Sequence, residues 1–249
     1  MAVRNKLITA LTAVALVLGM AGAQASVVIN GTRVIYPSDE REVTVKLTNE
    51  GSLPALVQAW LDDGDPRALP QDTKVPFTLA PPLFRLDSKK GQTLRVVYTQ
   101  EPLAQDKETL FWLNVLEVPP SDTNVDKNML QLAFRSRIKF FFRPAGLRGN
   151  AREAPAQVAW KFVHGHNGGY ALQATNPTPY HVTFTNMTAT VGSSKWTNQT
   201  GGMVNPGATA EFDVGNTPPP GAVPTEVDYG FVDDYGAGVS GKYRPHAEH

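Results

Sequence analysis

The chain contains no cysteine in 249 residues, so no disulfide can stabilise it and its domains must hold together by packing alone. Basic and acidic residues balance at 23 each, which argues against a general binder of nucleic acid or of anionic membranes. After residue 25 no run of about 20 apolar residues occurs, so we expect no insertion into a membrane. Signals for helices are scarce along the whole chain.

Sequence signatures of enzymes are missing as well. There is no Gly-x-Ser-x-Gly elbow, no His-Glu-x-x-His pair and no phosphate-binding glycine loop, so we expect no catalytic residues and no cofactor. His164, His166 and His181 could in principle ligate a metal from neighbouring strands, but an exposed hairpin turn is the favoured interpretation. The acidic turn at Asp62, Asp63 and Asp65 fits no calcium-loop spacing. The sequence therefore predicts no metal site.

The first residues are typical of a bacterial secretory signal. Arg4 and Lys6 precede an apolar stretch from Leu7 to Leu18, and Ala23-Gln-Ala25 supplies the small residues of a cleavage site. We expect residues 1–25 to be a cleavable signal peptide and the mature, exported chain to begin at Ser26.

Short apolar or alternating runs between turn residues dominate the remainder. About seven such runs lie before Pro144, which is the strand count of an immunoglobulin-like sandwich, with Trp60 as a candidate for its buried tryptophan. After Arg143-Pro-Ala-Gly-Leu147 the pattern restarts in a smaller β domain. The sequence predicts an all-β protein of two immunoglobulin-like sandwiches, covering residues 26–146 and 147–249, at an angle to each other.

The segment from Asn128 to Pro144 is the most informative one. Its even-numbered positions are mostly apolar, all four of its basic residues are at odd-numbered positions, and side chains in a strand alternate between faces. The pattern predicts a strand of roughly 15 residues, longer than the usual strand of about 3 to 10. The apolar positions are Leu130, Leu132, Phe134, Ile138, Phe140 and Phe142. Taken alone, they favour an ordinary half-buried strand.

Several motifs, taken together, resemble one family. They are Thr32-Arg-Val-Ile-Tyr-Pro37, Leu53-Pro-Ala-Leu-Val-Gln-Ala-Trp60, Pro81-Pro-Leu-Phe-Arg-Leu86, Glu108-Thr-Leu-Phe-Trp-Leu-Asn-Val-Leu-Glu-Val-Pro-Pro120, Ile138-Lys-Phe-Phe-Phe-Arg-Pro144, Asn176-Pro-Thr-Pro-Tyr180 and Asp234-Tyr-Gly236. In this order, across both halves, the chain resembles the PapD-like periplasmic pilus chaperones of the chaperone-usher pathway. The short interval between Pro120 and Asn128 resembles the short F1-G1 loop class.

The resemblance implies a periplasmic protein, not an enzyme, that binds pilin (fimbrial) subunits and delivers them to an outer-membrane usher. In such chaperones the last strand of the first domain, called G1, fills a groove in the incomplete sandwich of the subunit, which is donor-strand complementation. By resemblance, Leu130, Leu132 and Phe134 are the residues that enter the groove. Self-association of the free protein through the same segment is a further expectation.

The resemblance also implies two charged groups of residues. Arg33 and Lys139 match the pair that anchors the terminal carboxylate of the subunit and thereby sets the register of the donated strand. Glu108, Arg143 and Asp234 match an interdomain ion-pair group that holds the angle between the domains. Phe134, where an aliphatic residue is common, and Asp233, where asparagine is frequent, are departures from the pattern.

Two alternatives remain open at this point. One is an exported two-domain β-sandwich adhesin or carbohydrate-binding module that stacks sugars on surface aromatics such as Trp196. The other is an exported metal-dependent enzyme centred on the histidines.

Overall fold

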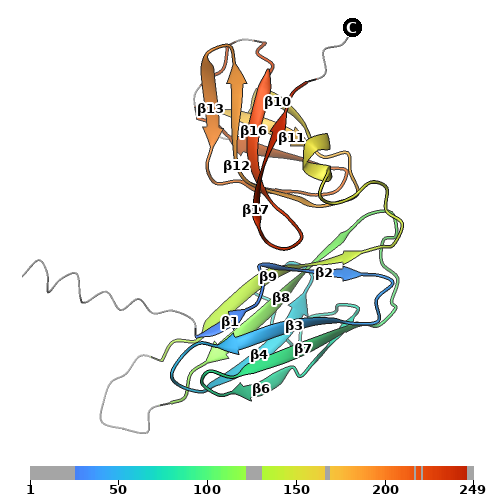
Figure 1. The fold of residues 1–249 in the computed structure, drawn as a ribbon, viewed down its shortest axis with the longest axis vertical. Helices are drawn as coiled ribbons and strands as arrows, with labels where there is room; N and C mark the ends of the chain where they lie inside the picture. Colours follow the sequence, from blue (N-terminus) through green and yellow to red (C-terminus); the bar gives the residue numbers. More distant parts are fainter. Residues whose placement is uncertain (1–25, 122–130, 166–168, 216, 220, 246–249) are drawn as a thin grey trace, which may run out of the picture.

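The computed structural model describes residues 26–121, 131–165, 169–215, 217–219 and 221–245. These residues form two β-sandwiches, each around its own hydrophobic core, in an L-shaped arrangement (Figure 1). The first core is built from residues between 27 and 142, and the second from residues between 154 and 231. The predicted fold class is thus confirmed. In the described part of the chain no helix is long and apolar enough to cross a membrane.

The first domain packs a four-stranded sheet against a five-stranded one. The smaller sheet has the order β1 (Val27–Ile29), β3 (Val43–Asn49), β7 (Gly91–Tyr98), β5 (Phe77–Ala80). The larger has the order β2 (Arg33–Pro37), β9 (Phe134–Arg143), β8 (Thr109–Val118), β4 (Ala55–Asp62), β6 (Leu83–Leu86). The pairing of β2 with β9 is parallel, whereas the other strand pairs are antiparallel. The beginning of the domain therefore contributes to both of its sheets.

Apolar side chains at alternate positions of β9 face the core, as the sequence pattern predicts. Phe140 and Phe142 are fully buried in the core, and Ile138 packs against it. The rings of Phe77 and Tyr36 surround them, with centroids 5.1 Å and 6.0 Å from that of Phe140. Such aromatic contacts add to the burial of apolar area, so β9 anchors the first core.

Trp60 lies in β4, between two residues of the first core. It is buried, but its neighbours Ala59 and Leu61 belong to the core cluster and Trp60 does not, because adjacent residues of a strand face opposite ways. The guanidinium of Arg135 covers its ring at 4.6 Å. Trp60 is therefore buried, as the sequence predicted, but on the face of β4 that Arg135 covers.

The second domain has a three-stranded and a five-stranded sheet. The smaller has the order β10 (Ala159–His164), β11 (Tyr170–Thr175), β15 (Thr209–Asp213). In the larger, the order is β13 (Ser194–Asn198), β12 (Val182–Val191), β16 (Glu226–Val232), β17 (Gly238–Tyr243), and β14 (Gly202–Val204) also pairs with β12. A single 3-10 turn (η1, Ala154–Gln157) precedes β10 in the described chain. The exact domain limits at residues 146 and 147 stay a prediction.

Trp196 lies inside the second domain. Only 5% of its surface is exposed, and its ring packs edge-on against that of Phe162 at 5.4 Å between centroids. A sugar cannot stack on a ring that is already covered on its faces and edges. The carbohydrate-binding alternative therefore loses the residue on which it rested.

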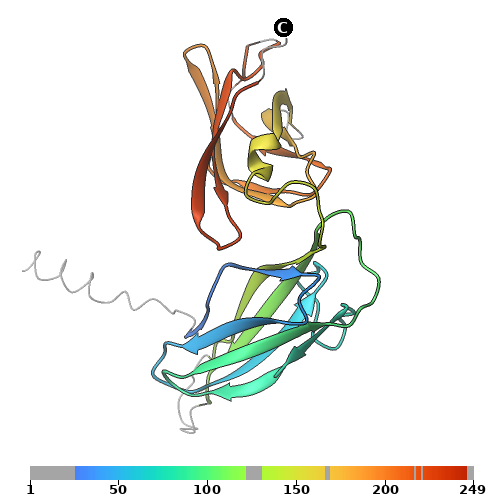
Figure 2. The ribbon, with the colours of Figure 1, turned by 45° about the vertical axis from the view of Figure 1, so that its right-hand side comes forward.

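The two domains meet on one side of the molecule, through the chain that leaves β9 and enters η1 (Figure 2). The hairpin of β16 and β17 extends from the second domain toward the strands β2 and β9 of the first (Figure 1). These three segments border the space between the domains. The residues with predicted binding roles lie there.

Several strands differ from the sequence prediction. The strands β5, β6, β13, β14 and β17 were not predicted, because they are short or rich in glycine and polar residues. In addition, β9 begins at Phe134, whereas the pattern predicted a strand that starts near residue 128. Phe134 pairs with Glu117, and β8 ends one residue later, before two prolines that lack the N–H groups needed for a sheet. Among the described residues of this domain, no strand pairs with residues 131–133.

Candidate functional site

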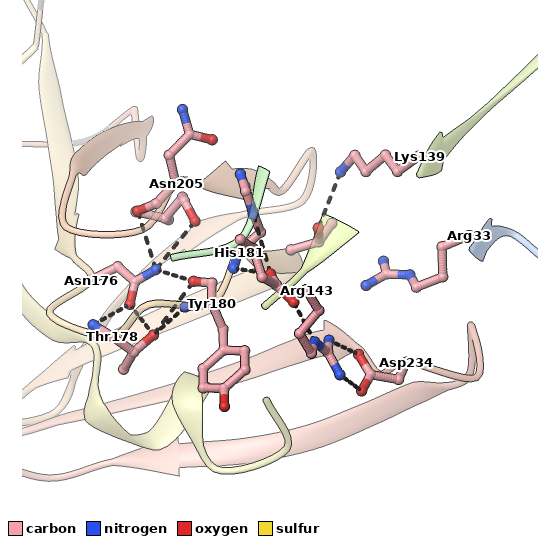
Figure 3. A network of polar contacts seen from close by, with 12 residues as sticks. Arg33, Lys139, Arg143, Asn176, Thr178, Tyr180, His181, Asn205 and Asp234 are labelled. Carbon is pink, nitrogen blue, oxygen red and sulfur yellow. Dashed lines mark hydrogen bonds and ion pairs between the residues drawn. The ribbon is translucent and has the colours of Figure 1, made fainter. Parts of the chain in front are cut away.

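Arg33 and Lys139 are brought together by the parallel pairing of β2 with β9, in which their Cα atoms are direct partners. Both side chains extend into the space between the domains (Figure 3). There Arg33 Nη1 donates to the carbonyl oxygen of Val232 at 3.1 Å, and Lys139 Nζ donates to Thr183 Oγ1 at 3.1 Å. Two cations of the first domain thus touch neutral groups of the second.

Neither cation has a carboxylate within ion-pair distance among the described residues. Burial, together with the charge of Arg33, lowers the pKa of Lys139 to about 8. Burial also lowers the pKa of Arg33, although Asp234, Asp233 and Glu108 oppose the effect from a distance. The Nε of Arg33 is buried without a hydrogen-bond partner. Two desolvated charges with spare donors form a site for an anion.

The other basic residues of β9 are already paired. Arg137 lies 2.5 Å from Asp62, whose side chain is fully buried, and Arg135 donates to Asn114 Oδ1 at 2.8 Å and lies 3.6 Å from Asp62. Arg143 is also paired with carboxylates. Of the four basic residues in this strand, Lys139 is the one without a carboxylate in the described structure. The charge pattern of β9 thus singles out the position next to Arg33.

The sequence reasoning missed the cluster around Asp62, which it interpreted as part of an acidic turn. Burial opposes ionisation of Asp62, but hydrogen bonds from Arg137, Asn114 and Gly64 outweigh it and lower its pKa. The rings of Trp60 and Trp112 lie under the guanidinium groups of Arg135 and Arg137, at 4.6 Å and 4.3 Å. This cluster fixes the outer face of β9 close to Phe134.

Between the domains lies a cavity of about 320 Å³ that both domains line. Arg33 forms part of its wall on the side of the first domain, and His181, Thr183, Asp233 and Tyr235 contribute from the second. Tyr235 is 92% exposed, so one side of the cavity ends in an open aromatic ring. The recess therefore lies beside Arg33, one of the two cations of the anion site.

Glu108, Arg143 and Asp234 also come together across the domain boundary. Figure 3 shows Arg143 directed at Asp234. Arg143 Nε donates to Glu108 Oε1 at 2.6 Å, and its two terminal nitrogens donate to the carboxylate of Asp234 at 2.7 Å and 2.8 Å. Burial disfavours the charge of Arg143, but the contacts with Asp234 and Glu108 outweigh this effect and raise its pKa. One guanidinium of the first domain is thus bound by a carboxylate from each domain.

His181 is a further member of this group that the sequence did not reveal as such. Its backbone N–H donates to Glu108 Oε2 at 2.7 Å, its Nδ1 lies 3.2 Å from the same oxygen, and its ring packs on Phe141 at 5.1 Å between centroids. The described residues contain no cluster of three or more histidine or acidic side chains that could hold a metal. His164 packs on Tyr170 instead, and His166 lies outside the described residues.

A tight turn holds Asp234 in position. Asp233 Oδ1 accepts hydrogen bonds from the N–H groups of Tyr235 at 3.0 Å and Ala237 at 2.8 Å. Gly236 has a φ of +82°, and a Cβ there would lie 2.4 Å from Thr32 Oγ1 of the first domain. Only glycine permits both this conformation and the close approach. Asp233, the departure from the family pattern, therefore stabilises the turn rather than joining the ion pairs.

The expected donor residues have different positions in the structure. Leu130 lies outside the described residues. Leu132 precedes β9 and is 47% exposed, although it is a large apolar side chain. Phe134 is half-buried at the first position of β9. Among the expected donor residues, Leu132 is thus not buried in the core of its own domain. The length class of the preceding loop also depends on undescribed residues and stays a prediction.

Both halves of the chain match known sequence families. Residues 26–148 match the N-terminal domain of PapD, described as a pili and flagellar-assembly chaperone. Residues 153–243 match the C-terminal domain of the pili assembly chaperone PapD.

Two similar proteins are the probable fimbrial chaperone YadV of Escherichia coli (strain K12) and the chaperone protein FimB/FhaD of Bordetella pertussis. The chain is 52% identical to YadV over 164 residues and 52% identical to FimB/FhaD over 165 residues. Each match covers 64% of this chain and 66% of the relative, which is slightly less than two thirds of its length.

Solved structures are similar over more of the chain. The crystal structure of the YadV chaperone has a TM-score of 0.74 and 40% identity, and the match covers 89% of this chain and 100% of that one. A structure of the Salmonella enterica SafA pilin in complex with the SafB chaperone has a TM-score of 0.71 and 27% identity, covering 90% and 99%.

Proposed function

The chain belongs to the PapD family of pili assembly chaperones, and from this premise we propose that it captures pilin subunits in the periplasm by donating the segment around β9. In this proposal the subunit is held until an outer-membrane usher receives it. The structure of SafB with the SafA pilin supports pilin as the partner. The basic and apolar residues at the amino end support export by a signal peptide, although residues 1–25 lie outside the described structure.

The observation that carries the proposal is an open edge on β9. On one side β8 pairs with β9 from Phe134 to Phe142, but on the other side β2 pairs only from Lys139 to Arg143. The backbone groups of residues 134–138 therefore have a free side in the described structure. Free strand edges bind extended segments of other proteins by continuing the sheet.

The direction of the added strand follows from the charges. A strand parallel to β9 that fills this edge must stop where β2 begins, and its terminal carboxylate then lies at Arg33 and Lys139. An antiparallel strand would place its terminal ammonium group, or uncharged backbone, at the same two cations. The site therefore favours a parallel segment that ends in a free carboxylate. This fixed end sets the register between β9 and the captured strand. Alternating apolar side chains alone would allow the strand to slip by two residues.

The apolar donor side chains supply most of the affinity in this proposal. Burying one large apolar side chain contributes about 1.5–3 kcal/mol, so Leu130, Leu132 and Phe134 contribute on the order of 5–9 kcal/mol before ordering costs. Leu132 begins from a half-exposed position, so it has apolar surface to bury on a partner. The proposal requires no nucleotide, cofactor or metal.

Replacing Leu132 with glutamate is expected to abolish capture of a co-expressed pilin while the free protein keeps its fold. The side chain is exposed, so a charge there does not disturb the core, but in the groove of a subunit it would be buried without a partner. Co-purification of the 1:1 complex and urea unfolding of the free protein measure the two effects. Leu69→Glu, at another exposed leucine, is the control that keeps capture. Unfolding of the free Leu132→Glu protein would show that Leu132 is a core residue and contradict the proposal.

Affinity for the subunit is expected to decrease as the pH rises above about 8, where Lys139 loses its proton in the free protein. Binding of a carboxylate favours charged Lys139, so above this pH binding must take up one proton, and the affinity decreases by up to about tenfold per pH unit. Below pH 8 it should be constant until the carboxylates titrate. Titration of pilin peptide at several pH values measures the slope, and Lys139→Met should remove it. A constant affinity for wild type up to pH 10 would disprove the role of Lys139.

A further inference from the structure

Besides Asp62 and Glu108, a further buried carboxylate of the first sandwich is that of Glu117. Glu117 is near the end of β8 and shares its strand face with Phe111, Leu113 and Val115, which belong to the first core. The residue is only 5% exposed. A carboxylate that faces a core is unfavourable unless hydrogen bonds and an opposite charge compensate for the lost water.

The contacts of Glu117 come from the first two residues of the described chain. The backbone nitrogen of Ser26 donates to Oε1 at 3.2 Å, Ser26 Oγ donates to the same oxygen, and the backbone nitrogen of Val27 donates to Oε2 at 2.9 Å. No lysine, arginine or histidine of the described residues lies within ion-pair distance. The carboxylate therefore has good hydrogen bonds but no cation.

The surroundings of Ser26 are closely fitted to a small residue. Its carbonyl oxygen accepts a hydrogen bond from Glu50 N at 2.7 Å, and a Cβ on Gly51 would lie 2.5 Å from Ser26 Cβ. Val27 then begins β1 as the partner of Asn49. Ser26 is thus held by its backbone, its hydroxyl and a close glycine, in an orientation that directs its nitrogen at Glu117.

We propose that the α-amino group of Ser26, once residues 1–25 are removed, is the cation that pairs with Glu117. Hydrolysis of the bond between Ala25 and Ser26 by a peptidase consumes one water and leaves a carboxylate on Ala25 and, after protonation, an ammonium group on Ser26. The nitrogen keeps its place beside Oε1 and gains the positive charge that Glu117 lacks. This inference rests on the export proposed above, but not on the capture of pilin.

The position of the pair connects processing with the donated segment. Glu117 is the Cα partner of Phe134, the residue at which β9 begins. An ion pair here stabilises the last part of β8 and, through the sheet, the first residue of β9. A chain that keeps its leading segment has an uncharged amide at Ser26 and lacks this stabilisation.

Four proteins test the inference: chains that begin at Ser26 or keep Gln24-Ala25 before it, each with Glu117 or with Glu117→Gln. With Glu117, the two extra residues are expected to lower the melting temperature by about 2–4 °C, the shift that corresponds to roughly 1 kcal/mol in a protein of this size. In the Glu117→Gln background the same extension should change it by less than about 1 °C. Equal shifts in both backgrounds would overturn the ion pair.

Acetylation of the Ser26 amine in the unmutated mature chain provides a second test that needs no substitution at Glu117. The acetyl group removes the charge and should cause the same loss of melting temperature as the extension; no change would overturn the inference. Mass spectrometry of the exported protein tests the premise separately. A mature chain that starts at Ser26 supports it, and any other start overturns it. Co-purification with pilin reports on the proposed capture independently of these results.

Discussion

Replacing Lys139 with methionine is expected to abolish subunit capture and, at the same time, to make the free protein more stable at pH 7. Loss of one partner of a buried charge pair typically costs 2–5 kcal/mol of binding free energy, which corresponds to a decrease in affinity of about 30- to 5,000-fold. In the free protein the charged lysine is itself unfavourable, because it is half-buried beside Arg33 without a carboxylate. Most substitutions that abolish binding do not stabilise the fold.

The sign of the stability effect follows from the pKa of Lys139. It is about 8 in the folded protein and 10.5 in the unfolded chain, so between these values the unfolded chain binds more protons. Stability therefore increases with pH across that window, and below pH 8 the folded state carries the full cost of the charge. After a discount for partial exposure, methionine should raise the free energy of unfolding at pH 7 by about 1–2 kcal/mol.

Urea unfolding and titration with a pilin-derived peptide measure both effects. Lys161→Met is a matched control, because Lys161 is exposed on β10 and should change neither quantity by more than about 0.5 kcal/mol. Lys139→Arg keeps the charge and should retain part of the affinity. A Lys139→Met protein that binds as tightly as wild type would disprove the anchor, and one that is less stable would disprove the cost assigned to the charge.

Replacing Arg143 with alanine is expected to cause the largest loss of stability, about 3–5 kcal/mol. The substitution leaves the carboxylate of Glu108, which is 2% exposed, without its guanidinium in the interface between the domains. It also frees Asp234, which the turn at Gly236 holds against the first domain. We therefore expect a wider distribution of angles between the domains in addition to the lower free energy of unfolding.

Chemical denaturation measures the stability, and small-angle scattering measures the spread of domain angles. Arg95→Ala is the matched control, because Arg95 forms a similar pair with Glu42 on the exposed face of the first domain. An exposed pair contributes at most about 1 kcal/mol, so the control should unfold close to wild type. Similar losses for both substitutions would contradict the interdomain role of Arg143.

Features that depend on neighbouring residues in the sequence were predictable. The alternation along β9, the restart of the β pattern after Pro144 and the motifs around Arg33 led to two sandwiches, because the period of a strand can be read directly from a sequence. The proximity of Arg33 and Lys139 was predicted only by resemblance to a family. Their pairing depends on the parallel register of β2 and β9, which no local pattern specifies.

Features that depend on distant contacts were not predictable. Asp62 was interpreted as part of an acidic turn, although Arg137 of β9 and Asn114 of β8 enclose its carboxylate. His181 was considered only as a metal ligand, an interpretation that was not favoured, and its contact with Glu108 of the other domain was not foreseen. The start of β9 was placed too early, because the pattern of alternation continues at residues 131–133, where no described strand of the same domain pairs with the chain. That last difference is informative, since an alternating segment without an internal partner is suited to an external one.

The most direct test of the account is the affinity of the protein for two peptides that copy the C-terminal strand of the pilin, one with a free carboxylate and one amidated. Calorimetry measures the affinity of wild type and of Lys139→Met for each of the two peptides. We predict that amidation weakens binding to wild type by about 30-fold or more and has little effect on binding to Lys139→Met. Equal affinity of wild type for both peptides would contradict the claim that Arg33 and Lys139 fix the end of the captured strand.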